Sequence, residues 1–140
     1  MQVNTKFDDS INRLSKKILI IDDDVQIRNI LEKLLSIIGF EIFTACDGYH
    51  AIEKLNKINV DLIITDYNMP GITGIDTIKS IKQINPDIPI IMISGHTFDN
   101  PNKLNDYVDV FFNKPVNFEK LKGCIEKLLN NNTPQINAKK

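Results

Sequence analysis

The sequence predicts an α/β fold in which a doubly wound parallel sheet carries helices on both faces. Short apolar runs rich in β-branched and aromatic residues alternate with longer amphipathic segments, which is typical of strands alternating with helices. Three of the short runs are apolar at successive positions, as expected of strands covered on both faces. The 140 residues suit one domain, which can bury a core without disulfides or a structural metal.

Five segments have the length and composition of strands. Each is brief and is bounded by Asp, Asn, Gly or Pro, which favour turns over strands. The expected strands are residues 18–21, 41–45, 62–65, 88–93 and 108–112. The first, third and fourth are the runs that are apolar throughout.

The segments between the strands show helical periodicity. The first covers residues 27–38 and is followed by Gly39, a typical stop signal. The second runs from residue 48 to about residue 57, and the third ends before Pro86. The last begins after Asn117, the expected N-cap. Its buried face is expected to comprise Phe118, Leu121, Ile125 and Leu128.

The remaining segments are polar or irregular. Between residues 98 and 106 the helical signal is weak, because Pro101 and several asparagines interrupt it. We expect residues 1–16 to form a flexible extension, residues 17–129 to form one domain, and residues 130–140 to form a polar tail.

Bulk composition excludes several classes of protein. Seventeen basic and eighteen acidic residues give a net charge of −1, without the basic balance that nucleic-acid binding favours. No apolar run approaches the roughly 18 residues of a membrane span, and residues 1–17 do not resemble a signal peptide. We therefore expect a cytoplasmic protein. Cys46 and Cys124 form no CxxC pattern and are expected to be reduced thiols in the core.

Polar side chains follow the expected strands at their carboxyl ends. Asp22 and Asp23 follow the first strand, Asp66 follows the third, Ser94 the fourth, and Lys114 the fifth. Ligands of open α/β sheets bind at this edge. The sequence therefore predicts that several carboxylates, one hydroxyl and one lysine lie together.

Neighbouring carboxylates need something to offset their repulsion. At about 4 Å and an effective dielectric of about 20, two of them repel by roughly 4 kcal/mol. A raised pKa, a divalent cation or Lys114 can offset this repulsion. Carboxylate oxygens favour Mg²⁺, and a cation beside a lysine is what phosphoryl transfer to an aspartate requires.

Each of these residues also has a purely structural interpretation. A run of aspartates after a strand is commonly a solvated turn or a helix cap, and Asp24 suits the cap. Asp66 and Ser94 could be ordinary turn residues, and Lys114 a surface lysine. The functional interpretation depends on their joint occurrence at one sheet edge.

Several ordered motifs resemble the receiver domains of response regulators in two-component signalling. The resemblance covers about residues 17–129. It is carried by residues 17–28, 61–74 and 111–115, with further agreement at residues 39–42 and 45–48. It implies a flavodoxin-like sheet of five parallel strands in the order 2-1-3-4-5.

The resemblance also implies a role for each matched position. Asp66 would accept the phosphoryl group, and Asp22 and Asp23 would bind Mg²⁺ together with Asp66 and the backbone carbonyl of Asn68. Lys114 would pair with a phosphate oxygen, and the peptide bond that follows it would be cis.

Two further matched positions would form the switch. Ser94 would hydrogen-bond the phosphate, and Phe111 would move with it.

The chain departs from the family between Ser94 and Lys114, where the segment is short and contains Pro101. His96 stands two residues after the switch hydroxyl, a position that tunes phosphoryl lifetime.

The resemblance implies a stand-alone phosphorylation switch, not a turnover enzyme. A sensor histidine kinase or a histidine phosphotransfer protein would donate the phosphoryl group. The switch would act by binding a downstream protein or by relay, as a monomer or as a phosphorylation-dependent dimer, with no direct contact with nucleic acid or membrane.

Three other functions fit the sequence less well. A phosphohydrolase of the haloacid-dehalogenase type would need a carboxylate two residues after the nucleophile, where this chain has Asn68. An adaptor that has lost phosphorylation would not need the complete set of site residues. Nucleotide binding lacks its glycine-rich loops.

Overall fold

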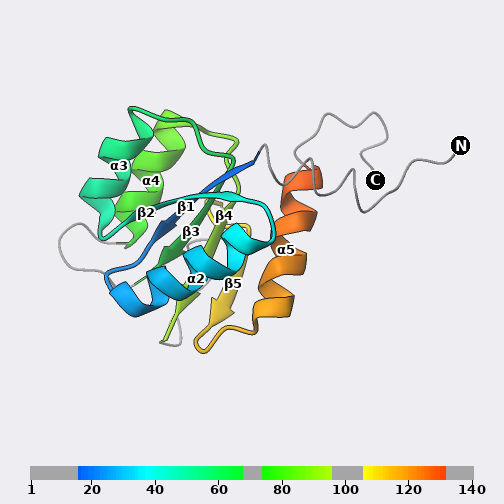
Figure 1. Ribbon diagram of the computed structural model, residues 1–140. Helices are drawn as coiled ribbons and strands as arrows, with labels where there is room; N and C mark the ends of the chain where they lie inside the picture. The colour runs from blue at the N-terminus through cyan, green and yellow to red at the C-terminus, as the bar shows by residue number, and fades with distance from the viewer. Residues whose placement is uncertain (1–15, 68–73, 96–105, 132–140) are drawn as a thin grey trace, which may run out of the picture.

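The computed structural model describes residues 16–67, 74–95 and 106–131 (Figure 1). Five strands and four helices lie within these ranges. The strands are β1 (Lys17–Ile21), β2 (Glu41–Ala45), β3 (Leu62–Asp66), β4 (Ile90–Ser94) and β5 (Val110–Asn113). The helices are α2 (Val25–Ile37), α3 (Gly48–Leu55), α4 (Gly74–Ile84) and α5 (Phe118–Asn131).

The strands form one parallel sheet in the order β2-β1-β3-β4-β5. The predicted fold class and strand order are therefore confirmed. β3 and β4 are buried along their whole length, and four of the five residues of β1 are buried. Their continuous apolar sequences reflect this position between two helical layers.

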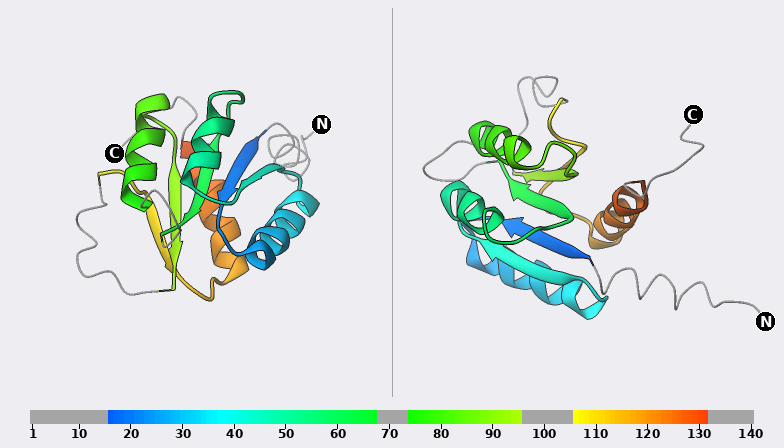
Figure 2. Two further views of the ribbon diagram at one scale, coloured as in Figure 1. Left: turned by 90° about the vertical axis from the view of Figure 1, so that its left-hand side faces the viewer. Right: turned by 90° about the horizontal axis from the view of Figure 1, so that it is seen from above.

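The sheet divides the core into two layers (Figures 1 and 2). On one side, Ala51 and Leu55 of α3 and Ile78 and Ile81 of α4 pack on the sheet; we call this the α3–α4 layer. On the other side α2 and α5 pack on the sheet, and we call this the α2–α5 layer. Its buried helical residues are Leu31, Leu35, Leu121, Ile125 and Leu129.

The last helix differs slightly from its expected pattern. Leu121 and Ile125 are buried, whereas Phe118 and Leu128 are only partly buried and Leu129 takes the core position. The helix also continues to Asn131, two residues beyond the expected domain end. The helical periodicity continues through Leu129. The change to a polar composition after residue 129 therefore places the end of this helix too early.

Two strands begin two residues later than expected. β4 begins at Ile90, where residue 88 was expected, and β5 begins at Val110, where residue 108 was expected. The amide of Ile88 bonds the carbonyl of Asn85 in the turn after α4, at 3.4 Å, and Pro89 has no amide to donate. The pairing with β3 starts at Ile63 and Ile90, and the Ile90 amide donates to the Asp109 carboxylate, at 2.8 Å.

The ends of α2 follow the predicted signals. Asp24 is the N-cap, and its carboxylate accepts hydrogen bonds from the amides of Gln26 and Ile27. Gly39 ends the helix with a φ of 116°, a backbone conformation that residues with a Cβ rarely adopt. The predicted cap of α5 is also confirmed, since Asn117 accepts a bond from the amide of Lys120, at 3.0 Å.

We expect Asp24→Ala to lower the free energy of unfolding by about 1 kcal/mol, because it removes a side chain that accepts two bonds from the first turn of α2. Phosphorylation should persist, since the amide of Asp24, not its side chain, contacts Asp22. Urea denaturation checks the first expectation. An unchanged midpoint would show that water replaces the cap at no cost.

Some sequence-based expectations lie outside the described residues. They concern the flexible extension up to residue 15, Asn68, His96, Pro101 and the tail after residue 131. Among the described residues, no helix is both long enough and apolar enough to cross a membrane.

Candidate functional site

The predicted carboxylates meet at the carboxyl edge of the sheet. Asp22 follows β1, Asp66 ends β3, and the two strands are neighbours in the sheet. One carboxylate oxygen each from Asp22, Asp23 and Asp66 lie within 4.8 Å of one another. Asp22 and Asp66 are 4% and 6% exposed, whereas Asp23 is exposed. Two buried acids and one exposed acid therefore form an open-sided cluster.

Lys114 joins the two buried acids from the end of β5. Its Nζ lies 3.4 Å from Oδ2 of Asp22 and 3.5 Å from Oδ2 of Asp66. Its amide donates to the carbonyl of Ser94, at 2.9 Å, so β4 holds the backbone of the lysine in place. The Lys114–Pro115 peptide bond is cis, as the resemblance implied.

The loop after β1 holds Asp22 through its backbone as well as its side chain. The Asp22 amide donates to the carbonyl of Ala45, at 3.1 Å, and its Oδ1 accepts from the Asp24 amide, at 2.9 Å. Arg28 donates through Nη1 to the Asp22 carbonyl, at 2.6 Å. No sequence motif pointed to a role for Arg28. Its position one turn into α2 could have indicated the contact with Asp22, since the first turn of this helix faces back toward the preceding loop.

The electrostatics of the cluster favour a further positive charge. Burial raises the pKa of the Asp22 carboxyl above its ordinary value of 3.8, and repulsion from Asp66 acts in the same direction. The hydrogen bond from the Asp24 amide and the charge of Lys114 lower the pKa, but not enough to reverse the shift. One lysine therefore does not fully offset the carboxylates.

We expect Asp22→Asn to stabilise the metal-free protein at neutral pH, on the order of 1 kcal/mol. The folded protein holds the Asp22 proton more tightly than the unfolded chain. The tighter binding of this proton stabilises the folded wild type at low pH. That stabilisation is lost as the pH rises from 3.8 through the raised pKa of Asp22. Asparagine keeps an oxygen for the Asp24 amide but carries no charge.

Urea denaturation in EDTA, at pH 7 and again near pH 4, measures this effect. The stability difference between Asp22→Asn and the wild type should shrink at the lower pH. A variant less stable than the wild type at pH 7 would mean that the ion pair with Lys114 outweighs burial.

The expected switch residues occupy neighbouring strands. Ser94 is fully buried at the end of β4, directly after Ile93, which pairs with Asp66. Phe111 is partly buried in β5, pairs with Met92 and packs against the α3–α4 layer. The structure therefore places Ser94 at the sheet edge that carries the acidic cluster, and Phe111 against the α3–α4 layer.

The donor set fits Mg²⁺. It consists of carboxylate oxygens alone, which are hard ligands, and Asp23 is exposed on the open side where water can complete the coordination. Asp22, Asp23 and Asp66 would hold the ion, whose charge would offset the burial and the repulsion from Asp66 that together raise the pKa of Asp22. The expected backbone ligand, Asn68, lies outside the described residues.

Comparison with known proteins agrees with this geometry. The chain matches the family described as response regulator receiver domain over residues 18–126. The probable transcriptional regulator ycf27 of Cyanophora paradoxa is 36% identical over 116 residues, which cover 81% of this chain and 48% of that protein. The chain thus spans about half the length of the curated transcriptional regulators it matches.

Solved structures extend the likeness to three dimensions. A two-component response regulator from Clostridium difficile superposes with a TM-score of 0.81 at 28% identity, covering 86% of this chain and all of that one (100%). TrrA from Thermotoga maritima, in complex with Mg²⁺ and BeF, has a TM-score of 0.71 at 34% identity, over 81% of this chain and 98% of its own. The chain therefore belongs to the response-regulator receiver domains of two-component systems, signalling switches that accept a phosphoryl group and generally bind Mg²⁺.

Proposed function

We propose that Asp66 of this receiver domain accepts a phosphoryl group, in a Mg²⁺-dependent reaction, from a phosphohistidine on a sensor kinase or a phosphotransfer protein. One observation carries the proposal. The buried carboxylate of Asp66 lies within 4.8 Å of two other carboxylates and 3.5 Å from the ammonium group of Lys114. A cation and a lysine at one carboxylate supply what transfer to aspartate requires.

In the proposed step, a carboxylate oxygen of Asp66 attacks the phosphorus in line with the bond to the donor imidazole. The oxygen–phosphorus bond forms as the phosphorus–nitrogen bond breaks, and its electron pair returns to the imidazole. Lys114 lies where it can move from Asp66 toward a phosphoryl oxygen. Asp22, Asp23 and Asp66 would hold Mg²⁺, whose charge would stabilise the equatorial phosphoryl oxygens.

Ser94 and Phe111 would transmit the change. The Ser94 hydroxyl would donate to a phosphoryl oxygen, and Phe111 would change its packing against the α3–α4 layer. The response would reach a downstream protein by phosphorylation-dependent binding, or the phosphoryl group would be relayed. Ser94 is fully buried, and Phe111 is partly buried against the α3–α4 layer, which supports this route.

The test uses acetyl phosphate as the donor, with Mg²⁺ or with EDTA. With Mg²⁺, intact-mass spectrometry should find one added phosphoryl group, stable in acid and labile in base, and peptide mapping should assign it to Asp66. In EDTA the adduct should be absent. An adduct on another residue, or full labelling in EDTA, would overturn the proposal.

A further inference from the structure

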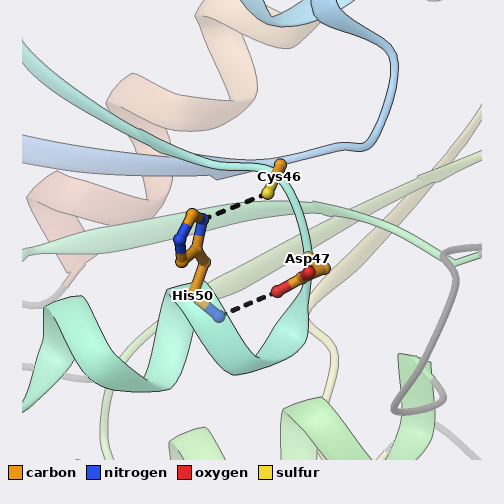
Figure 3. Close-up of side chains that lie close together, drawn as sticks. All are labelled: Cys46, Asp47 and His50. Carbon is orange, nitrogen blue, oxygen red and sulfur yellow. Dashed lines mark hydrogen bonds between the residues drawn. The ribbon is translucent and has the colours of Figure 1, made fainter.

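A second cluster of metal-binding side chains lies at the start of α3, apart from the acidic cluster. It consists of Cys46, Asp47 and His50 (Figure 3). One ligand atom from each lies within 4.8 Å of the other two. The Cys46 sulfur is 3.1 Å from Nδ1 of His50. Cys46, expected from the sequence to be a core thiol, is only half-buried and faces an exposed histidine.

Local structure fixes these three residues relative to one another. Cys46 directly follows β2, and Asp47 is the N-cap of α3, with its Oδ1 accepting a bond from the His50 amide, at 2.8 Å. His50 lies in the first turn of the helix, so its ring reaches back over the turn to the sulfur (Figure 3). The cap thus holds the backbone on both sides of the cluster.

We propose that Cys46, Asp47 and His50 form a binding site for a transition-metal dication, Zn²⁺ being the best fit. A thiolate, a carboxylate and an imidazole are the three donor types that Zn²⁺ accepts. Cys46 as thiolate and Asp47 as carboxylate contribute two negative charges, which match the dication. Three ligands leave the fourth tetrahedral position for water.

The positions of the ligand atoms allow this coordination with a small adjustment. Ordinary Zn–S and Zn–N bonds at a tetrahedral angle put sulfur and nitrogen roughly 3.5 Å apart. The observed separation of 3.1 Å therefore has to widen slightly. His50 is exposed, so its ring can make this movement. The cap bond occupies one lone pair of the Asp47 carboxylate, which has about four.

The helix end does not exclude a cation. The amino terminus of a helix carries roughly half a positive charge, which opposes a bound dication. The two negative charges of the ligands are about four times as large as this partial positive charge, so the net field at the site attracts the metal. Asp47 also satisfies one of the free amides of this terminus, which reduces the opposing charge further.

The two metal sites differ in chemistry although they are connected. The acidic cluster offers oxygens alone, whereas the second cluster offers sulfur, nitrogen and oxygen, and these softer donors favour Zn²⁺ over Mg²⁺. The connection is Ala45, which precedes Cys46 and accepts a bond from the Asp22 amide, at 3.1 Å. An experiment on Zn²⁺ must therefore keep the acidic cluster occupied.

Calorimetric titration of the full chain with Zn²⁺, in excess Mg²⁺ and a phosphine reductant, tests the proposal. We expect one bound ion per chain. Cys46→Ser and His50→Ala should each weaken binding by more than about tenfold, since even loss of an outer partner of a ligand costs roughly 10–100-fold. Cys124→Ser is the matched control and should bind normally. Burial raises the pKa of the Cys124 thiol, which disfavours the thiolate that a metal needs.

Titration with Co²⁺ gives a readout that needs no variant. The wild-type protein should develop thiolate-to-cobalt charge-transfer absorption, which only a bound sulfur produces. Circular dichroism checks that Cys46→Ser keeps its helices. The proposal is overturned by a wild-type protein without this absorption, by equal Zn²⁺ affinity in Cys46→Ser, or by equal losses in Cys46→Ser and Cys124→Ser.

Discussion

Asp66→Asn should abolish phosphorylation by acetyl phosphate and leave the fold intact. The substitution preserves size and keeps one oxygen, but an amide has no anionic oxygen to attack phosphorus. It also removes one of the two carboxylates that contact Lys114, so the lysine would pair with Asp22 alone. We expect no detectable adduct under conditions that label the wild type to near completion.

Intact-mass spectrometry measures the loss, and circular dichroism checks the fold. Asp87→Asn is the matched control, because Asp87 is an exposed aspartate in the turn after α4, away from the site edge. It should label at the wild-type rate. If Asp66→Asn carries an adduct of unchanged yield, the acceptor is another residue and the assignment of Asp66 is wrong.

Gly74→Ala should produce the largest loss of stability among single methyl additions at described glycines. A Cβ at Gly74 would lie 2.6 Å from the carbonyl oxygen of Tyr67, closer than a Cβ comes to an atom to which it is not bonded. The obstacle is backbone, so either α4 or the end of β3 must shift. Overpacking of this kind typically costs 1–3 kcal/mol, roughly, which exceeds the gain of about 1 kcal/mol from helix propensity.

The same shift should slow phosphorylation, because Tyr67 directly follows Asp66. Gly123→Ala is the control. A Cβ there meets nothing within 4 Å, and its place inside α5 predicts a gain of about 0.5–1 kcal/mol. Urea denaturation should thus shift in opposite directions for the two variants, and only Gly74→Ala should label more slowly than the wild type. Equal stabilities would mean that the contact between α4 and Tyr67 relaxes freely.

Much of the fold follows from local sequence signals. Continuous apolar runs predict the central strands, and Asp24, Gly39 and Asn117 predict helix ends because capping depends on the residue and its immediate neighbours. The strand starts expected at residues 88 and 108 were each wrong by two residues, since β4 begins at Ile90 and β5 at Val110. Where a strand begins depends on which of its amides find an acceptor on a neighbouring segment. The Ile90 amide, for example, donates to the Asp109 carboxylate, which is a tertiary contact.

The site was predictable in composition but not in detail. That Asp22, Asp66 and Lys114 meet follows from the common edge of parallel strands. The bond from Arg28 to the Asp22 carbonyl and the contact of Cys46 with His50 depend on the conformations of the Arg28 and His50 side chains near the starts of α2 and α3. Hydrophobic periodicity carries no information about either.

The division of the core by the sheet has a consequence for how the protein tolerates change. The buried side chains of the α3–α4 layer and the α2–α5 layer lie on opposite faces of the strands. Substitutions in different layers should therefore add, within about 0.5 kcal/mol, in their effects on unfolding. Phe111 packs in the first layer and Phe112 in the second. Side chains of one layer can therefore change without disturbing the packing of the other layer.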